Sequence, residues 1–149
     1  MAIEAIARSW IGTPYVHQAS VKGAGCDCLG LLRGVWRELM GEEPEKTPPY
    51  SADWAEASGE ETLYMALARH LREIPLRTVA PGDAVLFRMA RHGPAKHCGI
   101  VGEKDGGLSL IHARQNHCVS EEPFSVFWRR KLVFAFRLGC DENTNSLHP

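Results

Sequence analysis

The spacing of apolar residues changes type near the middle of the chain, and this change constrains the fold more than any other feature. In the first half, apolar residues recur at helical spacing over residues 2–11, 28–40 and 60–73. After the turn sequence PGD at 81–83, runs typical of strands follow at 84–89, 97–102, 108–114, 118–121 and 132–138, with a short helix or wide turn at 124–130. Helices followed by a run of strands predict an α+β fold, with the N-terminal helices packed on one side of an antiparallel β-sheet.

The chain of 149 residues is long enough for one domain with a sizeable core. We expect that domain over residues 1–139, followed by a polar tail over 140–149. Residues 42–59 are rich in proline and turn-forming residues, and we expect a long surface loop there. This loop is a candidate for a docking surface or for a wall of the substrate site.

The charge balance argues against nucleic acid as a partner. Lys and Arg number 17 and Asp and Glu number 18, so the net charge is -1. The apolar runs are too short to cross a bilayer, so we expect no membrane insertion. The first 12 residues lack the pattern of a signal peptide, which predicts synthesis in the cytoplasm without export. Five cysteines in a reducing compartment suggest one reactive thiol among buried ones, and no disulfide framework.

Cys28 stands where a helix is expected to begin, in the run GCDCLGL at 25–31. A thiol in the first helical turn meets unpaired backbone N–H groups and the positive end of the helix dipole. Both favour the thiolate, which is the nucleophilic form. Asp27 is a suitable cap residue. Cys28 lies on the apolar stripe of the helix, at helical spacing from Leu32 and Val35, so its sulfur should face the domain. Cys26 precedes the helix and lacks this placement.

Two histidines occur in neighbouring predicted strands. His97 begins the strand HCGIV at 97–101, and His112 lies within the strand LIHA at 110–113. If the strands form a hairpin that turns between Lys104 and Asp105, the two histidines are directly opposed, at about 5 Å between Cβ atoms. One imidazole could then hold the tautomer of the other while that ring acts as base for Cys28. The sequence is therefore consistent with a Cys–His–His triad.

Five short motifs resemble those of the NlpC/P60 family of papain-like cell-wall peptidases. In chain order they are GTPY at 12–15, DCLGL at 27–31, PGD at 81–83, HCGIV at 97–101 and IHA at 111–113. The resemblance implies a papain-like fold and a catalytic Cys28, with His97 as base and His112 as its orienting residue. Two positions depart from the family pattern. Leu29 replaces a frequent serine, and Cys98, which we expect to be a small buried side chain on the opposite face from His97, replaces an aliphatic residue.

A subset of this family is more similar still. The runs HQAS at 17–20, GCDCLGL at 25–31 and YSADW at 50–54 resemble cell-wall peptidases encoded among the tail genes of tailed phages and gene transfer agents. This resemblance implies hydrolysis of peptidoglycan stem peptides at the γ-D-glutamyl–diaminopimelate bond. It also implies tail-tip or hub proteins as partners. The enzyme would be made without a signal peptide, carried on a phage-like particle, and active in the envelope of the target cell.

The resemblance further implies how the reaction proceeds. The Cys28 thiolate would attack the amide carbonyl, and the backbone N–H of Cys28 and the Tyr15 hydroxyl would hold the oxyanion. Tyr15 is also a candidate for binding substrate, with His17 and Gln18 as weaker candidates. We expect no cofactor and no metal.

Other classes of function stay open at the level of sequence. A metal-binding module could draw its ligands from the cysteines and histidines, namely Cys26, Cys28, His97, Cys98, His112, His117 and Cys118. The C-x-C spacing and the placement of His97 and Cys98 on opposite faces of a strand argue against it. A non-catalytic structural tail protein that retains the fold is a second alternative. A papain-like amidase or acyltransferase is a third.

Overall fold

The computed structural model describes residues 2–46 and 61–138. The helices are α1 (Ala2–Arg8), α2 (Cys28–Met40), α3 (Thr62–Ala68) and α4 (Val126–Lys131), with a 3₁₀ turn, η1 (Leu76–Thr78). The strands are β1 (Ser20–Val21), β2 (Gly25–Cys26), β3 (Arg72–Ile74), β4 (Asp83–Phe87), β5 (His97–Lys104), β6 (Gly107–His112), β7 (Ser120–Pro123) and β8 (Leu132–Arg137). The predicted tail at 140–149, the YSADW motif at 50–54 and most of the predicted loop at 42–59 lie outside the described residues.

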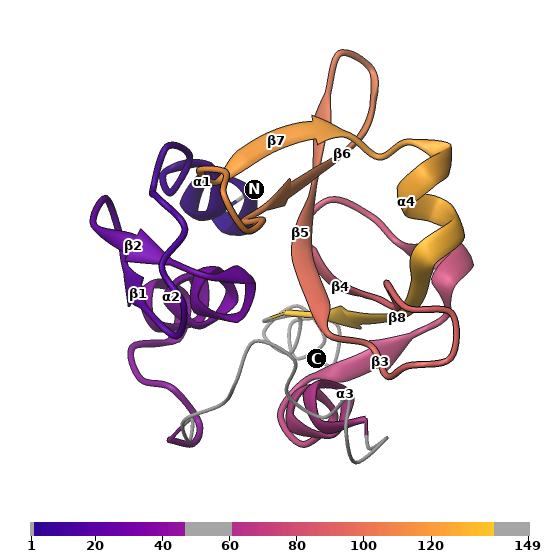
Figure 1. Cartoon of the computed structure of the whole chain (residues 1–149), viewed down its shortest axis with the longest axis horizontal. Helices are drawn as coiled ribbons and strands as arrows, with labels where there is room; N and C mark the ends of the chain where they lie inside the picture. The colour runs from indigo at the N-terminus through magenta and orange to yellow at the C-terminus, as the bar shows by residue number, and fades with distance from the viewer. Residues whose placement is uncertain (1, 47–60, 139–149) are drawn as a thin grey trace, which may run out of the picture.

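Among the described residues, six strands form one antiparallel sheet in the order β3-β8-β4-β5-β6-β7, and β1 and β2 form a separate small hairpin. Figure 1 shows α1 and α2 on one side of β5 and α4 on the other. The predicted α+β architecture is confirmed, with N-terminal helices on an antiparallel sheet. The short helix or wide turn expected at 124–130 is α4, and it covers the second face of the sheet.

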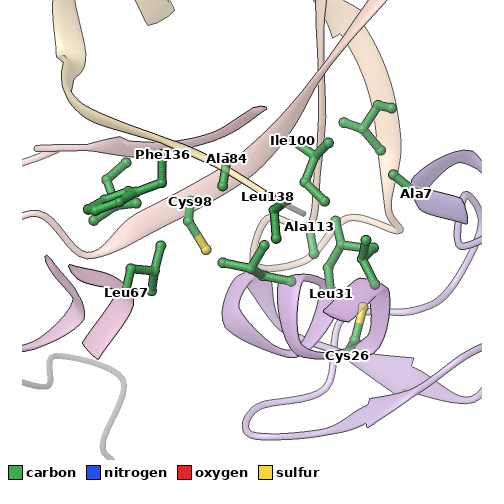
Figure 2. Packing of buried hydrophobic residues seen from close by; sticks show 14 of the residues in the cluster. Ala7, Cys26, Leu31, Leu67, Ala84, Cys98, Ile100, Ala113, Phe136 and Leu138 are labelled. Atoms are coloured by element: carbon green, nitrogen blue, oxygen red, sulfur yellow. The ribbon is translucent and has the colours of Figure 1, made fainter. Parts of the chain in front are cut away.

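The two faces of the sheet bury two apolar clusters. The larger joins the sheet to α1, α2 and α3 and includes Trp10, Leu31, Val35, Leu63, Ala84, Leu86, Cys98, Ile100 and Phe136. Figure 2 shows Cys98 projecting from the sheet toward the helix that carries Leu31. The smaller cluster joins the other face to α4 and includes Val85, Phe87, Val101, Leu110 and Trp128. Because both faces are covered, all five residues of β4 are buried.

Two helices end earlier than the apolar spacing predicts. The first stops at Arg8, and the third stops at Ala68 instead of continuing to 73. The residues that follow α3 form β3, in which Arg72 pairs with Arg137 of β8. No strand was predicted there, because the partner that stabilises it lies far away in the sequence. By contrast, α2 has its predicted bounds and ends at Gly41, which adopts a φ of 99° that favours glycine.

The hairpin of β5 and β6 turns one residue later than predicted. Lys104 pairs with Gly107, so the turn is Asp105-Gly106, and both turn residues have positive φ (55° and 83°). This is the geometry of a two-residue type I′ turn, for which Asp-Gly is a favoured sequence. The predicted turn between Lys104 and Asp105 is therefore wrong, and so is the pairing of His97 directly opposite His112.

No helix in the described ranges combines the length and the apolarity needed to cross a membrane.

Candidate active site

The start of α2 is held by one buried carboxylate. Asp27 is 2% exposed; its Oδ1 accepts from Gly30 N at 2.7 Å, and its Oδ2 accepts from Gln18 N at 2.7 Å. Gly30 lies so close to the preceding loop that a Cβ there would be 1.9 Å from the carbonyl oxygen of Ala19. The Asp-x-x-Gly spacing thus fixes both the helix start and the loop against it. Asp27 is the helix cap that the sequence predicts, and Cys28 is the first residue of the helix.

Cys28 lies against the beginning of β5. Its Sγ is 3.9 Å from the carbonyl oxygen of Lys96, the residue before His97, and the side chain is partly exposed. The pKa of the Cys28 thiol is lowered well below its usual value, first by a hydrogen bond with Cys98 and then by the hydrogen bond and charge of His97, against the opposing effect of burial. Unpaired N–H groups in the first turn of α2 favour the thiolate as well. Cys28 is therefore placed and polarised as a nucleophile.

Cys98 is fully buried and contacts the same site. Its thiol donates to the backbone oxygen of Cys28 at 3.3 Å. The hydrogen bond with Cys28 and burial raise the pKa of Cys98 well above its usual value, so Cys98 keeps its proton. The sequence predicts that Cys98 is buried on the opposite face of the strand from His97. It does not predict the contact with Cys28, because strand alternation does not reveal which element packs on that face.

The two histidines form a short hydrogen bond, His97 Nε2 to His112 Nδ1 at 2.8 Å, and their rings meet edge to face. The strand register continues from the pair Ile100 and Ile111, which places Gly99 opposite His112 and His97 two residues away on the same face. A Cβ at Gly99 would be 3.0 Å from the Cβ of His112. The missing side chain therefore leaves room for His97 to reach His112 diagonally.

A carboxylate and an indole complete this group, and sequence reasoning missed both. His112 Nε2 bonds Glu122 Oε2 at 2.7 Å, and Trp128 Nε1 donates to Glu122 Oε1 at 3.3 Å. The Trp128 ring packs on both imidazoles, with centroid distances of 5.5 Å to His97 and 5.0 Å to His112. Neither residue stands in a recognisable motif, so the sequence alone gives no signal for them.

The protonation states of this group follow from its burial. His112 is 1% exposed, and burial together with the neighbouring charge of His97 lowers its pKa to about 4, against the opposing effect of Glu122. Burial tends to raise the pKa of Glu122, but the hydrogen bond and charge of His112 and the bond from Trp128 outweigh it, so this pKa falls below its usual value. At neutral pH the group therefore contains a neutral His112 and an ionised Glu122.

Tyr15 forms a β-bridge with Cys26, two residues before Cys28, and the other two predicted binding residues lie further along the same loop. Burial, and next the charge of Cys28, raise the pKa of Tyr15 to about 12, so its hydroxyl keeps its proton and can donate a hydrogen bond. His17 and Gln18 are exposed. They contact each other at 3.2 Å, and His17 Nδ1 is 3.8 Å from Asp27 Oδ2. Both lie next to the capping carboxylate of α2, to which Gln18 donates through its backbone N–H.

The remaining cysteines and histidines do not gather as metal ligands. In residues 2–46 and 61–138, no three His, Cys, Asp or Glu side chains form a group that could hold a metal ion. Cys26 is buried in the larger apolar cluster, and burial raises its pKa to about 12. His117 and Cys118 are exposed on the connection between β6 and β7. All four cysteines in the described part of the chain are free.

Comparison with known proteins places this geometry in a family. The chain matches the NlpC/P60 family over residues 12–137. It is 27% identical over 128 residues to the gamma-DL-glutamyl hydrolase of Bacillus subtilis (strain 168), a match that covers 85% of this chain but only 26% of that protein. The chain therefore spans about a quarter of the length of this relative.

Solved structures share the fold. The NlpC/p60 domain of the peptidoglycan hydrolase SagA superposes with a TM-score of 0.64 at 24% identity, covering 92% of this chain and 97% of that one. An NlpC/P60 family protein from Bacillus cereus gives a TM-score of 0.61 at 19% identity, covering 92% of this chain and 40% of that one. These likenesses show a common fold, and the family match spans most of the sequence. The chain belongs to the NlpC/P60 family.

Proposed function

We propose that this protein is a cysteine peptidase that hydrolyses the peptide stems of bacterial peptidoglycan. The observation that carries the proposal is the connected group formed by the Cys28 thiol, the His97 imidazole and His112, in which the pKa of Cys28 is lowered and His97 Nε2 is bonded to His112. Two proteins similar to this chain bear names that describe a glutamyl hydrolase and a peptidoglycan hydrolase, which supports the substrate class.

The proposed reaction assigns one role to each member of the group. The Cys28 thiolate attacks the carbonyl carbon of an amide, so that an S–C bond forms while the C–N bond breaks. His97, as imidazolium, gives its proton to the departing amine. A water molecule then attacks the thioester carbonyl and loses a proton to His97, which releases the acid and restores the thiolate. His112 orients His97 throughout.

The oxyanion of each tetrahedral intermediate is assigned to the backbone N–H of Cys28 and the hydroxyl of Tyr15. Tyr15 suits this role because its hydroxyl is protonated at neutral pH and its backbone bridges to Cys26, two residues before the thiolate. Replacing Tyr15 by Phe should lower kcat by about 10²–10³-fold, as loss of an oxyanion donor does elsewhere. A kcat close to that of the wild type would assign Tyr15 to packing. His17 and Gln18 stay candidates for contact with substrate beyond this centre.

The decisive experiment is digestion of diaminopimelate-type peptidoglycan followed by mass spectrometry of the released muropeptides. The wild type and Cys118→Ala should release the same fragments, because Cys118 is an exposed cysteine outside the site. Cys28→Ala should release none. Equal release by the wild type and Cys28→Ala, or release by neither, would contradict the proposal. Fragments cut only between sugar and peptide would indicate an amidase instead.

Two finer proposals rest on the sequence motifs. We place the cleaved bond between D-glutamate and diaminopimelate, and the mass of the products in the same digestion tests this. We also propose that the enzyme is carried on the tail of a phage-like particle, bound to tail-tip or hub proteins. Proteomics of purified particles tests that placement, and absence of the protein from particles whose other tail proteins are detected would refute it.

A further inference from the structure

Glu122 is the residue that ends the hydrogen-bond path leading away from Cys28. Its Oε2 lies 2.7 Å from His112 Nε2, and its Oε1 accepts from the Trp128 indole at 3.3 Å. The His112 side chain has no exposed surface, whereas that of Glu122 is 34% exposed. The carboxylate thus forms the solvent-facing end of a path whose other members are buried or partly buried.

The strand registers explain why these side chains meet. On β6, His112 is paired with Ser120 of β7, and Glu122 stands two residues further along on the same face. His97 stands in the equivalent diagonal relation on β5, across the gap left by Gly99. The three side chains therefore form a diagonal line across three adjacent strands, on the face that packs against α4.

An ionised carboxylate decides which nitrogen of each ring carries a proton. Because Glu122 can only accept, His112 Nε2 must be the N–H, and since His112 is neutral its Nδ1 has a free lone pair. That lone pair can accept only from an N–H, so His97 Nε2 carries a proton. The remaining nitrogen of His97, Nδ1, is then the one left to exchange a proton with Cys28.

We propose that Glu122 is a positioning residue that fixes the tautomers of His112 and His97 and places a negative charge behind the imidazolium formed during catalysis. Trp128 holds the carboxylate in place from α4 while its ring packs on both imidazoles. The catalytic consequence rests on the proposed function, whereas the fixing of tautomers concerns the resting enzyme and does not. Glu122 acts through His112 and does not touch the reacting atoms.

The chain offers a matched control in the neighbouring residue. Glu121 is on the same strand, but it faces α1, where Arg8 Nε and Ser109 Oγ donate to it at 3.0 Å and 2.6 Å. Glu121→Gln removes one carboxylate from the same strand without touching the histidines. Glu122→Gln keeps the size of the side chain and removes the charge. Glu122→Asp keeps the charge on a shorter arm.

Two measurements on the enzyme without peptidoglycan substrate test the proposal. The first is the pH dependence of alkylation of Cys28 by iodoacetamide, followed by mass spectrometry of the Cys28 peptide. The second is the tautomer of His112, read from ¹⁵N chemical shifts of the histidine rings. In Glu122→Gln the midpoint of the alkylation profile should move to higher pH, and His112 should populate both tautomers. Glu122→Asp should restore part of the wild-type behaviour, and Glu121→Gln should match the wild type.

Activity on peptidoglycan is the third readout. Glu122→Gln should lower kcat about 10- to 100-fold with little change in KM. Loss of the hydrogen-bond partner that orients a metal-binding histidine has an effect of this size in metalloenzymes. A Glu122→Gln variant that is folded by circular dichroism, alkylates like Glu121→Gln and keeps His112 in the Nε2–H form overturns the proposal. Failure of the wild type to cut peptidoglycan would refute the proposed function alone, because the first two readouts would still decide the role of Glu122.

Discussion

Acidification should destabilise this protein through His112, by an amount that follows from the burial of the ring. The His112 side chain has no exposed surface and its pKa is lowered to about 4, while in an unfolded chain a histidine has a pKa of about 6.5. Between these values the unfolded state binds a proton that the folded state does not. The stabilising contribution of neutral His112 is therefore fully present above about pH 6.5 and is lost as the pH falls toward 4.

The size of the effect can be worked out from the two pKa values. At 1.36 kcal/mol for each unit of difference, the full loss is about 3 kcal/mol, of which about 2 kcal/mol is lost between pH 7 and pH 5. Stopping at pH 5 keeps the measurement above the range in which most carboxylates titrate. A loss of this size is a large fraction of the stability of an ordinary domain.

Urea unfolding at pH 7 and pH 5 checks this prediction. His112→Gln removes the titrating ring, so its free energy of unfolding should fall by about 2 kcal/mol less between the two pH values than that of the wild type. His117→Gln is the control, because His117 is exposed. If the wild type and His112→Gln lose the same free energy on acidification, the buried ring is not held neutral and the reasoning fails.

Three further substitutions test the packing around the site. Gly30→Ala places a Cβ 1.9 Å from the carbonyl oxygen of Ala19, so we expect a loss of about 2–3 kcal/mol and a Tm about 5–10 °C lower; a Tm within 2 °C of the wild type would contradict this. Gly99→Ala places a Cβ 3.0 Å from the Cβ of His112. It should lower kcat on peptidoglycan while Tm stays close to that of the wild type, and an unchanged kcat would contradict this. Cys98→Ala removes the hydrogen-bond partner of the proposed nucleophile, so the alkylation profile of that thiol should move to higher pH, and an unchanged profile would show the partner to be unimportant.

The parts of the fold that the sequence predicts well are those with a chemical signal at each end. The helix α2 is one such part, because Asp27 can satisfy backbone N–H groups at its start and Gly41 can adopt the positive φ at its end. The strand β3 is the opposite case. Its residues continue a helical apolar pattern, and what makes them a strand is pairing with Arg137 and its neighbours more than 60 residues away. Local spacing cannot reveal a partner at that distance.

The residues of the candidate site also fall into those that a local motif reveals and those that depend on distant pairing. Cys28, His97 and His112 stand in short motifs whose residue types indicate a thiol nucleophile and its base, so the sequence predicts them as candidates. Glu122 does not, because its role depends on the register between β6 and β7, and the seven residues that connect these strands are too many for a two-residue hairpin turn whose sequence would reveal that register.

The pairing of β5 with β6 shows that a sequence can indicate two neighbouring strands and still give the wrong register between them. Asp105-Gly106 sets a two-residue turn, and this shifts the pairing so that His112 is opposite Gly99 and not opposite His97. This diagonal offset brings His97 Nε2 within 2.8 Å of His112 Nδ1, and the pairing of β6 with β7 brings Glu122 onto the other nitrogen of His112. The turn dipeptide therefore sets how the two histidines meet, and the separate pairing of β6 with β7 sets how the path of hydrogen bonds continues from His112 to a carboxylate.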